Sequence, residues 1–294
     1  MKISVCGSMH QNSSKEQLMQ LIKDLLLLRN KHIIEIEQRF YAYLLSQGFQ
    51  LDGISMFAPK GKLDTDILIS IGGDGTFLRT AKLIAGTSAG ILGVNSGHLG
   101  FLASLQPEDF AGFWREFEAG TMREEQRSLL EFSVVRPDGN EEVRGLALNE
   151  VSIIKRDTAS MISVATYING ELISNTPGDG LLISTPTGST AYALSVNGPV
   201  VHPHSPAILI CPIAPHTLNM RPLVIPNDVE IELHVDSRSG SFLVGIDGKS
   251  HPEVVGAILR IRLSDKRLRV LHATEYSYYK TLREKLMWGH DPRL

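Results

Sequence analysis

The chain has 294 residues, more than the roughly 100 to 200 residues of a single domain, so two domains are expected. Its formal net charge of −3 gives no basic field that would favour nucleic acid or an anionic membrane surface, and neither partner is expected. The two cysteines, Cys6 and Cys211, lack the neighbouring cysteines or histidines of a disulfide scaffold or a zinc finger. This cysteine usage suits a reducing compartment.

The N-terminal run Met1–Gly7 is a short strand-like segment without the apolar core and cleavage site of a signal peptide. The longest apolar clusters, such as Leu25–Leu28, fall well short of the roughly 20 residues that cross a bilayer. A cytoplasmic protein is therefore expected.

The first half of the sequence alternates between strand and helix patterns. Residues 67–71 form an apolar run that ends in glycines, as does a strand buried on both faces of a parallel sheet. Helical spacing follows over Phe77–Ile84 and a second strand over Gly90–Asn95, and this order predicts a three-layer α/β domain. The same patterns predict a strand at Ile3–Cys6 and helices at Lys15–Leu28 and Arg39–Gln47.

From about Leu129 the pattern changes to closely spaced strands, which predict a β-sandwich. A hairpin is expected where Glu131–Arg136 and Glu142–Leu148 flank Pro137-Asp138-Gly139-Asn140, because Pro presets one turn dihedral and Gly permits a positive φ. Further strands are expected at Ile162–Ile168, Ala207–Pro212, Val229–Val235, Ser241–Ile246, Ile258–Leu263 and Arg267–His272.

These patterns divide the chain into three segments. Residues 1–127 are expected to form the α/β domain and residues 128–273 the β-sandwich domain. The spacing of Tyr279, Leu282 and Leu286 predicts a final helix within residues 274–294, which we expect to pack back on the first domain.

The segment Gly72-Gly73-Asp74-Gly75-Thr76 lies at the carboxyl end of a predicted parallel strand and opens a helix. Open α/β sheets bind ligands at those strand ends, and a helix N-terminus with glycines offers N–H groups to phosphate oxygens. A carboxylate there would repel phosphate unless a cation or a hydroxyl lies between them, so Asp74 is interpreted as a base or metal partner. A helix N-cap in a tight turn is the equally favoured alternative.

A second polar stretch, residues 184–192, follows the apolar strand Leu181–Ile183 and holds five serine and threonine side chains. Hydroxyl groups supply neutral donors and acceptors, which suit a ribose or phosphate. A Ser/Thr-rich surface loop is the alternative. Asp179, just before this strand, is interpreted either as a ligand of a base or ribose or as a turn residue.

Asn149-Glu150 follows the predicted strand at residues 144–148 and precedes another apolar run. In a strand the two side chains would point to opposite faces unless a bulge intervenes, so one or both must find a polar partner. A ligand contact and a polar crossing between the domains both remain open. His98, in the glycine-spaced turn at residues 93–102, is interpreted as a structural histidine because no carboxylate accompanies it.

The familiar phosphate loop, dinucleotide fingerprint, zinc-protease and hydrolase-elbow motifs do not occur in the sequence. Taken together, the ordered segments that do occur resemble the NAD kinase family over most of the chain. The resemblance is carried by residues 72–78, 97–101, 148–151, 178–181, 184–192, 221–224 and 276–279. The glycine–aspartate turn alone is shared with phosphofructokinases and lipid kinases, whereas the ordered set is much more specific.

The resemblance implies transfer of the terminal phosphoryl group of ATP to the 2'-hydroxyl of the adenosine ribose of NAD, which forms NADP. It implies that Asp74 accepts the hydroxyl proton, that a divalent cation, Mg²⁺, arrives with the nucleotide, and that the protein itself holds no metal. Residues 128–273 would bind the dinucleotide, with Asn149-Glu150 meeting the nicotinamide-side ribose or the adenine. The implied nucleotide-binding residues are Gly73, Gly75, Thr76, Arg79, Phe101, Asn149, Glu150, Asp179, Thr187, Thr190, Ala191, Tyr192, Ala193, Leu194 and Ser195.

Two positions depart from patterns common in the family. Pro177 stands where many bacterial members carry Arg, and Lys249 occupies a place often held by Gln. The resemblance further implies a homodimer or homotetramer assembled through the β domain. A lipid or sphingoid-base kinase and a non-catalytic dinucleotide-binding regulator are the alternative functions.

Overall fold

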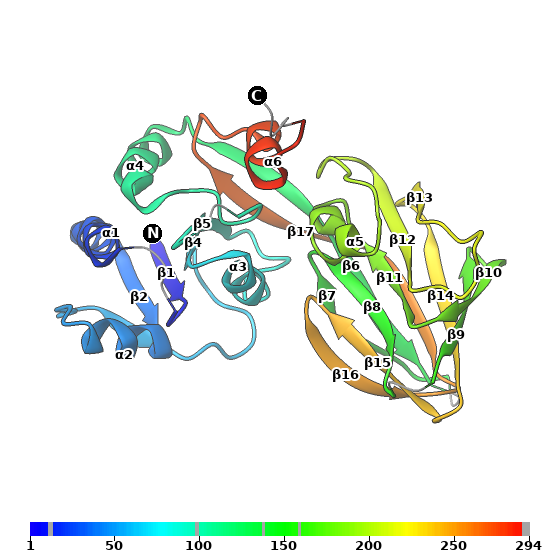
Figure 1. Ribbon diagram of the computed structural model, residues 1–294. Coiled ribbons are helices and arrows are strands. Elements are labelled where there is room, and N and C mark those ends of the chain that lie inside the picture. The colour runs from blue at the N-terminus through cyan, green and yellow to red at the C-terminus, as the bar shows by residue number, and fades with distance from the viewer. Residues whose placement is uncertain (11–13, 98–99, 137–138, 158–159, 290–294) are drawn as a thin grey trace. The chain divides into compact units, whose positions relative to one another are not determined.

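The computed structural model describes residues 1–10, 14–97, 100–136, 139–157 and 160–289, and its chain forms two compact units (Figure 1). Unit 1 comprises Met1–Gln126 and Leu268–Leu294, and unit 2 comprises Arg127–Arg267. The boundaries between the units fall inside two long strands, β6 (Arg123–Val135) and β17 (Ile258–His272).

Unit 1 is built on a parallel sheet, as the sequence predicted. The strand order is β17-β5-β4-β1-β2-β3, and each neighbouring pair is parallel. The central strands are buried along their whole length, which explains why their sequences read as apolar runs rather than as alternating patterns. The strands that unit 1 alone contains are β1 (Lys2–Gly7), β2 (Ile33–Glu37), β3 (Ser55–Phe57), β4 (Ile67–Ile71) and β5 (Gly90–Val94).

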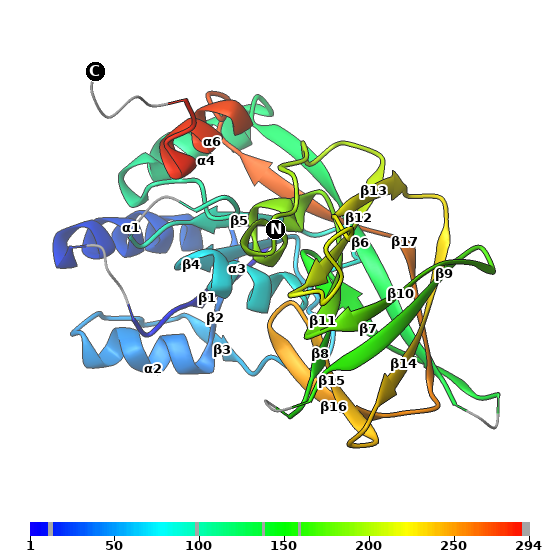
Figure 2. The ribbon, with the colours of Figure 1, turned by 45° about the vertical axis from the view of Figure 1, so that its right-hand side comes forward.

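The helices of unit 1 cover this sheet with apolar faces. In α1, Ser14 and Gln17 form a capping box, and the buried Leu18, Leu21, Ile22 and Leu25 recur at helical spacing. Helices α1 and α4 run side by side in both views, and aromatic residues of α4 join the same core (Figures 1 and 2). The helices and 3₁₀ turns are α1 (Lys15–Leu27), η1 (Leu28–Asn30), α2 (Gln38–Ser46), α3 (Asp74–Ala81), η2 (Pro107–Asp109), α4 (Phe110–Ala119) and α6 (Tyr278–Leu286).

Unit 2 consists of two largely antiparallel sheets with a shared apolar core, as predicted (Figure 2). One sheet has the order β13-β12-β11-β8-β15-β16, and the other joins β10, β9, β14, β17, β6 and β7. Val151 and Ile183 from the first sheet and Val164 and Leu233 from the second meet in this core. The strands and short helices are β7 (Glu141–Ala147), β8 (Glu150–Lys155), β9 (Ile162–Ile168), β10 (Glu171–Gly178), β11 (Gly180–Ser184), η3 (Thr187–Thr190), α5 (Tyr192–Ser195), β12 (Ala207–Ile213), β13 (Leu223–Pro226), β14 (Glu230–Ser237), β15 (Ser241–Ile246) and β16 (Lys249–Val254).

Several element boundaries differ from the sequence prediction. The helix expected at Phe77–Ile84 begins at Asp74, because the glycine turn itself enters the helix with Gly73 as N-cap. The two strands expected at Ile258–Leu263 and Arg267–His272 are one strand, whose polar residues 264–266 read as a turn but continue the extended backbone. Of the predicted hairpin turn, Pro137 and Asp138 lie outside the described residues, while the strands on either side pair antiparallel.

Candidate functional site

Asp74 is the first residue of α3, directly after the turn that follows β4. The N-cap of this helix is Gly73, so the N-cap interpretation of Asp74 is wrong. Its carboxylate instead reaches a second segment of unit 1, where the backbone N–H groups of Phe101, Leu102 and Ala103 donate to it at 2.9, 3.0 and 3.0 Å. The side chain is thereby fixed between a helix start and a loop 27 to 29 residues later.

The two oxygens of this carboxylate are not equivalent. Oδ1 accepts the N–H groups of Leu102 and Ala103, while Oδ2 accepts that of Phe101 alone. A carboxylate oxygen has about two acceptor directions, so among the described residues Oδ1 is saturated and Oδ2 keeps one direction open. The open direction can take a hydroxyl proton.

Glycines surround Asp74 for two different reasons. A Cβ on Gly100 would overlap Oδ1 of Asp74, so the close approach of the loop requires glycine there. A Cβ on Gly73 or Gly75, in contrast, would meet no atom of the described residues within 4 Å, chain neighbours and the helix's own backbone aside. Packing gives no reason for glycine at these two positions, and an approaching ligand would give one.

Arg79, predicted to bind nucleotide, is engaged within unit 1. Its guanidinium donates to Oε1 of Glu37 at 2.8 Å and to the carbonyl of Gly7 at 3.1 Å. The Glu37 side chain is 3% exposed, so Arg79 neutralises a buried carboxylate at the end of β2. Nothing in the local sequence marked Glu37, because its partner lies 42 residues away. His98 and Leu99 lie outside the described residues.

In unit 2, Leu148 and Asn149 form a bend between β7 and β8 rather than the continuation of a strand. The strand predicted to reach Leu148 ends at Ala147. The carboxylate of Asp247 accepts the N–H groups of Leu148, Asn149 and Glu150 at 3.0, 2.8 and 3.2 Å. One side chain therefore accepts the three consecutive backbone N–H groups at this bend.

The carbonyl groups of the same bend are held by the hydroxyl-rich stretch. Thr185 Oγ1 donates to the carbonyl of Leu148 at 2.6 Å, and Ser184 Oγ donates to that of Asn149 at 3.1 Å. Ser189 Oγ similarly bonds both backbone groups of Val201. Three of the five Ser and Thr hydroxyls in this stretch thus bond the backbone of the Leu148-Asn149 bend or of Val201.

The Asn149 side chain has an unmet hydrogen-bonding need. The residue is 5% exposed, and its Oδ1 has no hydrogen-bond partner among the described residues. A buried acceptor without a donor is destabilising unless a ligand supplies the donor. This is the site-like feature that the structure adds to the Asn149-Glu150 motif.

Tyr192, Glu150 and Asp179 are close enough to interact electrostatically within unit 2. Burial, followed by the charges of Glu150 and Asp179, raises the pKa of the Tyr192 phenol. Asp179 also pairs with Lys155, whose Nζ lies 2.7 Å from Oδ1. The charges of two predicted site residues thus act on a third, and Lys155 is a partner that the sequence did not indicate.

The other predicted residues of unit 2 lie along η3 and α5. Arg127 donates to Thr187 Oγ1 at 3.5 Å, and Thr190 Oγ1 donates to the carbonyl of Thr187 at 3.4 Å. Ala193 is fully buried among Leu182, Leu209 and Cys211, so its side chain belongs to the core. Ala191, Leu194 and Ser195 are partly or fully exposed.

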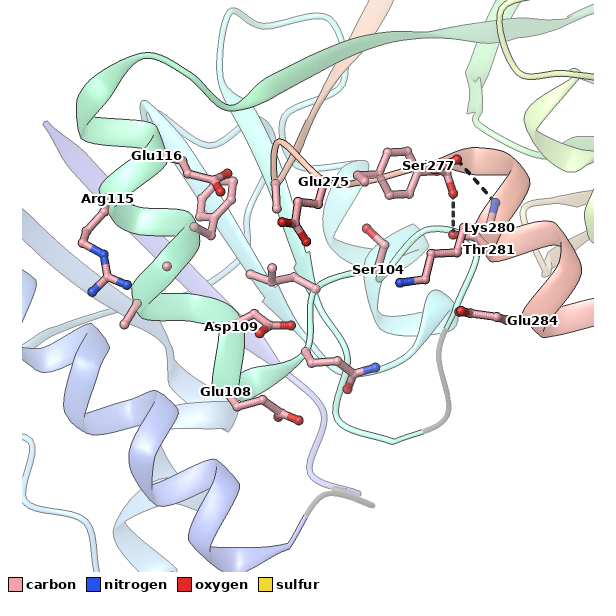
Figure 3. Close-up of a pocket in the computed structure, with 17 residues that line it drawn as sticks. Ser104, Glu108, Asp109, Arg115, Glu116, Glu275, Ser277, Lys280, Thr281 and Glu284 are labelled. Carbon is pink, nitrogen blue, oxygen red and sulfur yellow. Dashed lines mark hydrogen bonds between the residues drawn. The ribbon is translucent and has the colours of Figure 1, made fainter.

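A separate cavity of about 590 Å³ lies in unit 1 between α4 and the segment that leads into α6 (Figure 3). Ser277 is the N-cap of α6 there, and its Oγ accepts the N–H of Lys280 at 3.4 Å. The described residues that line this cavity include none of the predicted site residues. Its carboxylates, Glu108, Asp109, Glu116, Glu275 and Glu284, outnumber Arg115 and Lys280 and disfavour a polyphosphate.

Among the described residues, no three His, Cys, Asp or Glu side chains gather in a way that could hold a metal ion. None of the helices described is long and apolar enough to span a membrane.

Comparison with known proteins identifies the family. Residues 10–122 match the ATP-NAD kinase N-terminal domain, and residues 148–273 match the ATP-NAD kinase C-terminal domain. The chain is 41% identical over 297 aligned positions to an NAD kinase of Bacteroides fragilis and 39% identical to one of Flavobacterium psychrophilum, with all of both chains covered in each case.

Solved structures agree with this result. An NAD kinase from Archaeoglobus fulgidus in complex with ATP shares 25% identity and a TM-score of 0.73, covering 97% of this chain and 99% of the other. A yeast NADH kinase complexed with NADH shares the fold at a TM-score of 0.88 and 24% identity, covering 100% and 89%. The comparisons give no support to the lipid-kinase and regulator alternatives. Since full-length relatives and both halves of the chain agree, this protein belongs to the NAD kinase family.

Proposed function

We propose that this member of the NAD kinase family transfers the terminal phosphoryl group of ATP to the 2'-hydroxyl of the adenosine ribose of NAD, and that Asp74 accepts the hydroxyl proton. The relatives that support the reaction are NAD kinases matched over their full length. The observation that carries the role of Asp74 is its carboxylate, held by three N–H donors with one acceptor direction open on Oδ2.

The start of α3 is the proposed phosphate contact. Gly73 and Gly75 leave space above the backbone, so phosphate oxygens can approach the backbone N–H groups of Asp74 and Gly75 at the start of the helix. Phosphoryl transfer depends mainly on positioning and charge neutralisation, and the Mg²⁺ that enters with ATP as part of the substrate supplies the latter. Thr76 and Arg79 border this turn on the helix.

Oδ2 of Asp74 is the proposed proton acceptor. A general base must lie within hydrogen-bonding distance of the hydroxyl it activates, and its orientation must survive substrate binding. The three backbone donors provide that orientation without depending on a flexible side chain. The same carboxylate oxygen aligns the 2'-hydroxyl for attack as the phosphoryl group departs from ATP.

Unit 2 supplies the proposed contacts with the dinucleotide. Oδ1 of Asn149 would accept a donor of the dinucleotide, such as a ribose hydroxyl or an exocyclic amine, which meets its need for a partner. Glu150 and Asp179, whose charges act on the Tyr192 phenol, are assigned to further polar contacts with the dinucleotide. We assign Phe101 and the exposed groups of η3 and α5 to the remaining nucleotide contacts.

Conversion of NAD to NADP with ATP and Mg²⁺ tests the reaction, and absence of NADP above background would exclude it. Replacing Asp74 with Asn should lower turnover by at least about a hundredfold, the lower range for loss of a general base, while NAD binding persists. Asp64→Asn is the matched control, since Asp64 is an exposed aspartate of the same unit. Unchanged turnover in Asp74→Asn would remove Asp74 from this role.

We propose a cytoplasmic homodimer or homotetramer assembled through unit 2. The edge strands β10 and β13 expose apolar side chains, namely Leu172, Ile173, Leu223 and Val224. Light scattering should give a multiple of the 32.4 kDa chain mass. Leu223→Lys should weaken the assembly, whereas Leu27→Lys, at an exposed position of α1, should not. A wild-type protein of single-chain mass would contradict this proposal.

A further inference from the structure

Asp247 occupies the two-residue turn between β15 and β16. Asp247 and Gly248 have φ values of 45° and 78°, both in the left-handed region. Asp-Gly is a preferred pair for a hairpin turn in which both central residues have positive φ. Turn formation alone would therefore explain the two residue types.

The carboxylate of Asp247 makes contacts that turn formation does not require. Oδ2 accepts the N–H of Leu148 at 3.0 Å, and Oδ1 accepts those of Asn149 and Glu150 at 2.8 and 3.2 Å. The N–H of Asp247 in turn donates to the carbonyl of Glu150 at 3.1 Å. A hairpin turn nearly one hundred residues away along the chain thus determines the conformation of the bend.

The bend is held from its other side as well. Thr185 and Ser184 bond its carbonyl groups, and a Cβ on Gly188 would overlap the carbonyl oxygen of Asn149. With both donors and acceptors of the backbone engaged, the Cα–Cβ direction of Asn149 is set before any ligand arrives. Within the described parts of the chain, the Oδ1 atom of Asn149 has no hydrogen-bond partner.

We propose that Asp247 is a positioning residue for NAD binding, which acts by holding the backbone at Asn149 so that Oδ1 of Asn149 meets the dinucleotide. The inference rests on the proposed function, because it concerns how the same substrate is recognised. Asp247 itself touches no substrate in this scheme. Its effect passes through the backbone N–H groups of residues 148–150.

Two variants separate positioning from turn formation. Asp247→Gly keeps a residue that accepts positive φ but removes all three side-chain contacts. Asp247→Asn also keeps a favoured turn pair, since Asn-Gly suits this turn as well as Asp-Gly does. The Asn amide oxygen can replace Oδ1 and retain two contacts, while its NH₂ group faces the N–H of Leu148 and loses the third.

The expected result is a graded rise in the KM for NAD. Asp247→Gly should raise it by about tenfold and Asp247→Asn by about threefold, because misplacing a binding group by a fraction of an ångström weakens binding. The KM for ATP should change by less than about twofold in both variants, since positioning of Asn149 concerns the dinucleotide. Calorimetric titration with NAD should show the same order of affinities.

A matched control comes from another hairpin of unit 2. Asn169-Gly170, between β9 and β10, also has positive φ at both residues, and Oδ1 of Asn169 accepts the N–H of Glu230 at 2.9 Å. Asn169→Gly therefore removes a comparable side-chain contact from a comparable turn. It should leave the KM for NAD unchanged, and its thermal midpoint reports the cost of losing one such contact, whereas Asp247→Gly loses three.

A double variant tests the route through Asn149. If Asp247 acts by positioning Asn149, then adding Asp247→Gly to Asn149→Ala should raise the KM for NAD by less than about twofold further. Full additivity of the two effects would overturn the proposal. So would a KM for NAD within twofold of wild type in both Asp247 variants, or an equal rise in the KM for ATP. Wild-type protein that forms no NADP would instead refute the proposed function. Failure of the Asp247 proposal can therefore be told apart from failure of the proposed reaction.

Discussion

Gly100 lies against Asp74 so closely that a Cβ at position 100 would overlap Oδ1 of the carboxylate. The contact brings the N–H groups of residues 101–103 within hydrogen-bonding distance of the same side chain. A residue without catalytic atoms thereby controls where the proposed base points.

Gly100→Ala should lower kcat by roughly a hundredfold, because the loop or the carboxylate must move by about an ångström to make room. The control is Gly112→Ala in α4, where a new Cβ meets only Arg115 Nη2 at an ordinary 3.9 Å. Gly112→Ala should keep kcat and raise the free energy of unfolding by up to about 1 kcal/mol, since Ala favours helix. Steady-state kinetics measure kcat, and urea unfolding measures the free energy of unfolding. Wild-type turnover in Gly100→Ala would show that the contact with Gly100 does not control the position of the Asp74 carboxylate.

Gly188→Ala should destabilise unit 2 by about 2 kcal/mol or more, because its Cβ would overlap the carbonyl of Asn149 and Oγ of Ser184. Gly145→Ala serves as the comparison, as the nearest atom to its Cβ would be Ile246 Cδ1 at 3.6 Å. Urea unfolding should show a lower midpoint for Gly188→Ala only. Equal midpoints would mean that the bend at Asn149 yields more easily than its contacts indicate.

The two thiols should be inert in the folded protein. Cys6 and Cys211 are buried; burial raises the pKa of Cys211 to about 11, and burial together with the Glu37 charge raises the pKa of Cys6 well above its usual range. At pH 8 roughly one Cys211 thiol in a thousand would be ionised, and the thiolate is the reactive form. Ellman's reagent should therefore label no cysteine in the native protein and two in guanidinium. Fast native labelling would show that one of the thiols is accessible.

The Glu124–Arg269 pair of unit 1 should stabilise the fold in a pH-dependent way. Hydrogen bonds from Arg269, with Nε at 2.8 Å from Oε2, lower the pKa of Glu124 in the folded state. The stabilisation is therefore present above the unfolded-state pKa, near 4.3, and is lost as the pH falls through the lower folded-state pKa.

Because both side chains are partly exposed, Glu124→Gln should cost no more than about 1 kcal/mol at pH 7. Unfolding experiments on both proteins at pH 7 and at pH 3 measure the difference. It should shrink at the lower pH and in 1 M salt, where screening is strong. If the difference in free energy of unfolding between the two proteins is the same under all three conditions, the effect comes from packing and not from charge.

Local sequence patterns predicted much of the fold. The apolar run at residues 67–71 and the glycines after it predicted a buried parallel strand, which the structure has as β4. The closely spaced strands after Leu129 predicted the antiparallel unit. The pattern failed at residues 264–266, where three consecutive polar residues in a long, largely buried strand resemble a turn. Strand β2 and helix α4 were not predicted, since burial by distant segments stabilises both.

For the site, the sequence by itself determined which residue types stand where: a carboxylate among glycines at the end of a buried strand, an Asn-Glu pair after another strand, and a hydroxyl-rich segment. Only the tertiary structure decided what holds them. Asp74 and Leu102 are 28 residues apart in the chain, Asn149 and Asp247 are 98 apart, and most of the hydroxyls proved to bond the backbone. Local propensities act over one turn of helix or one strand, whereas these hydrogen bonds form only when the packed core brings distant segments within 3 Å of each other.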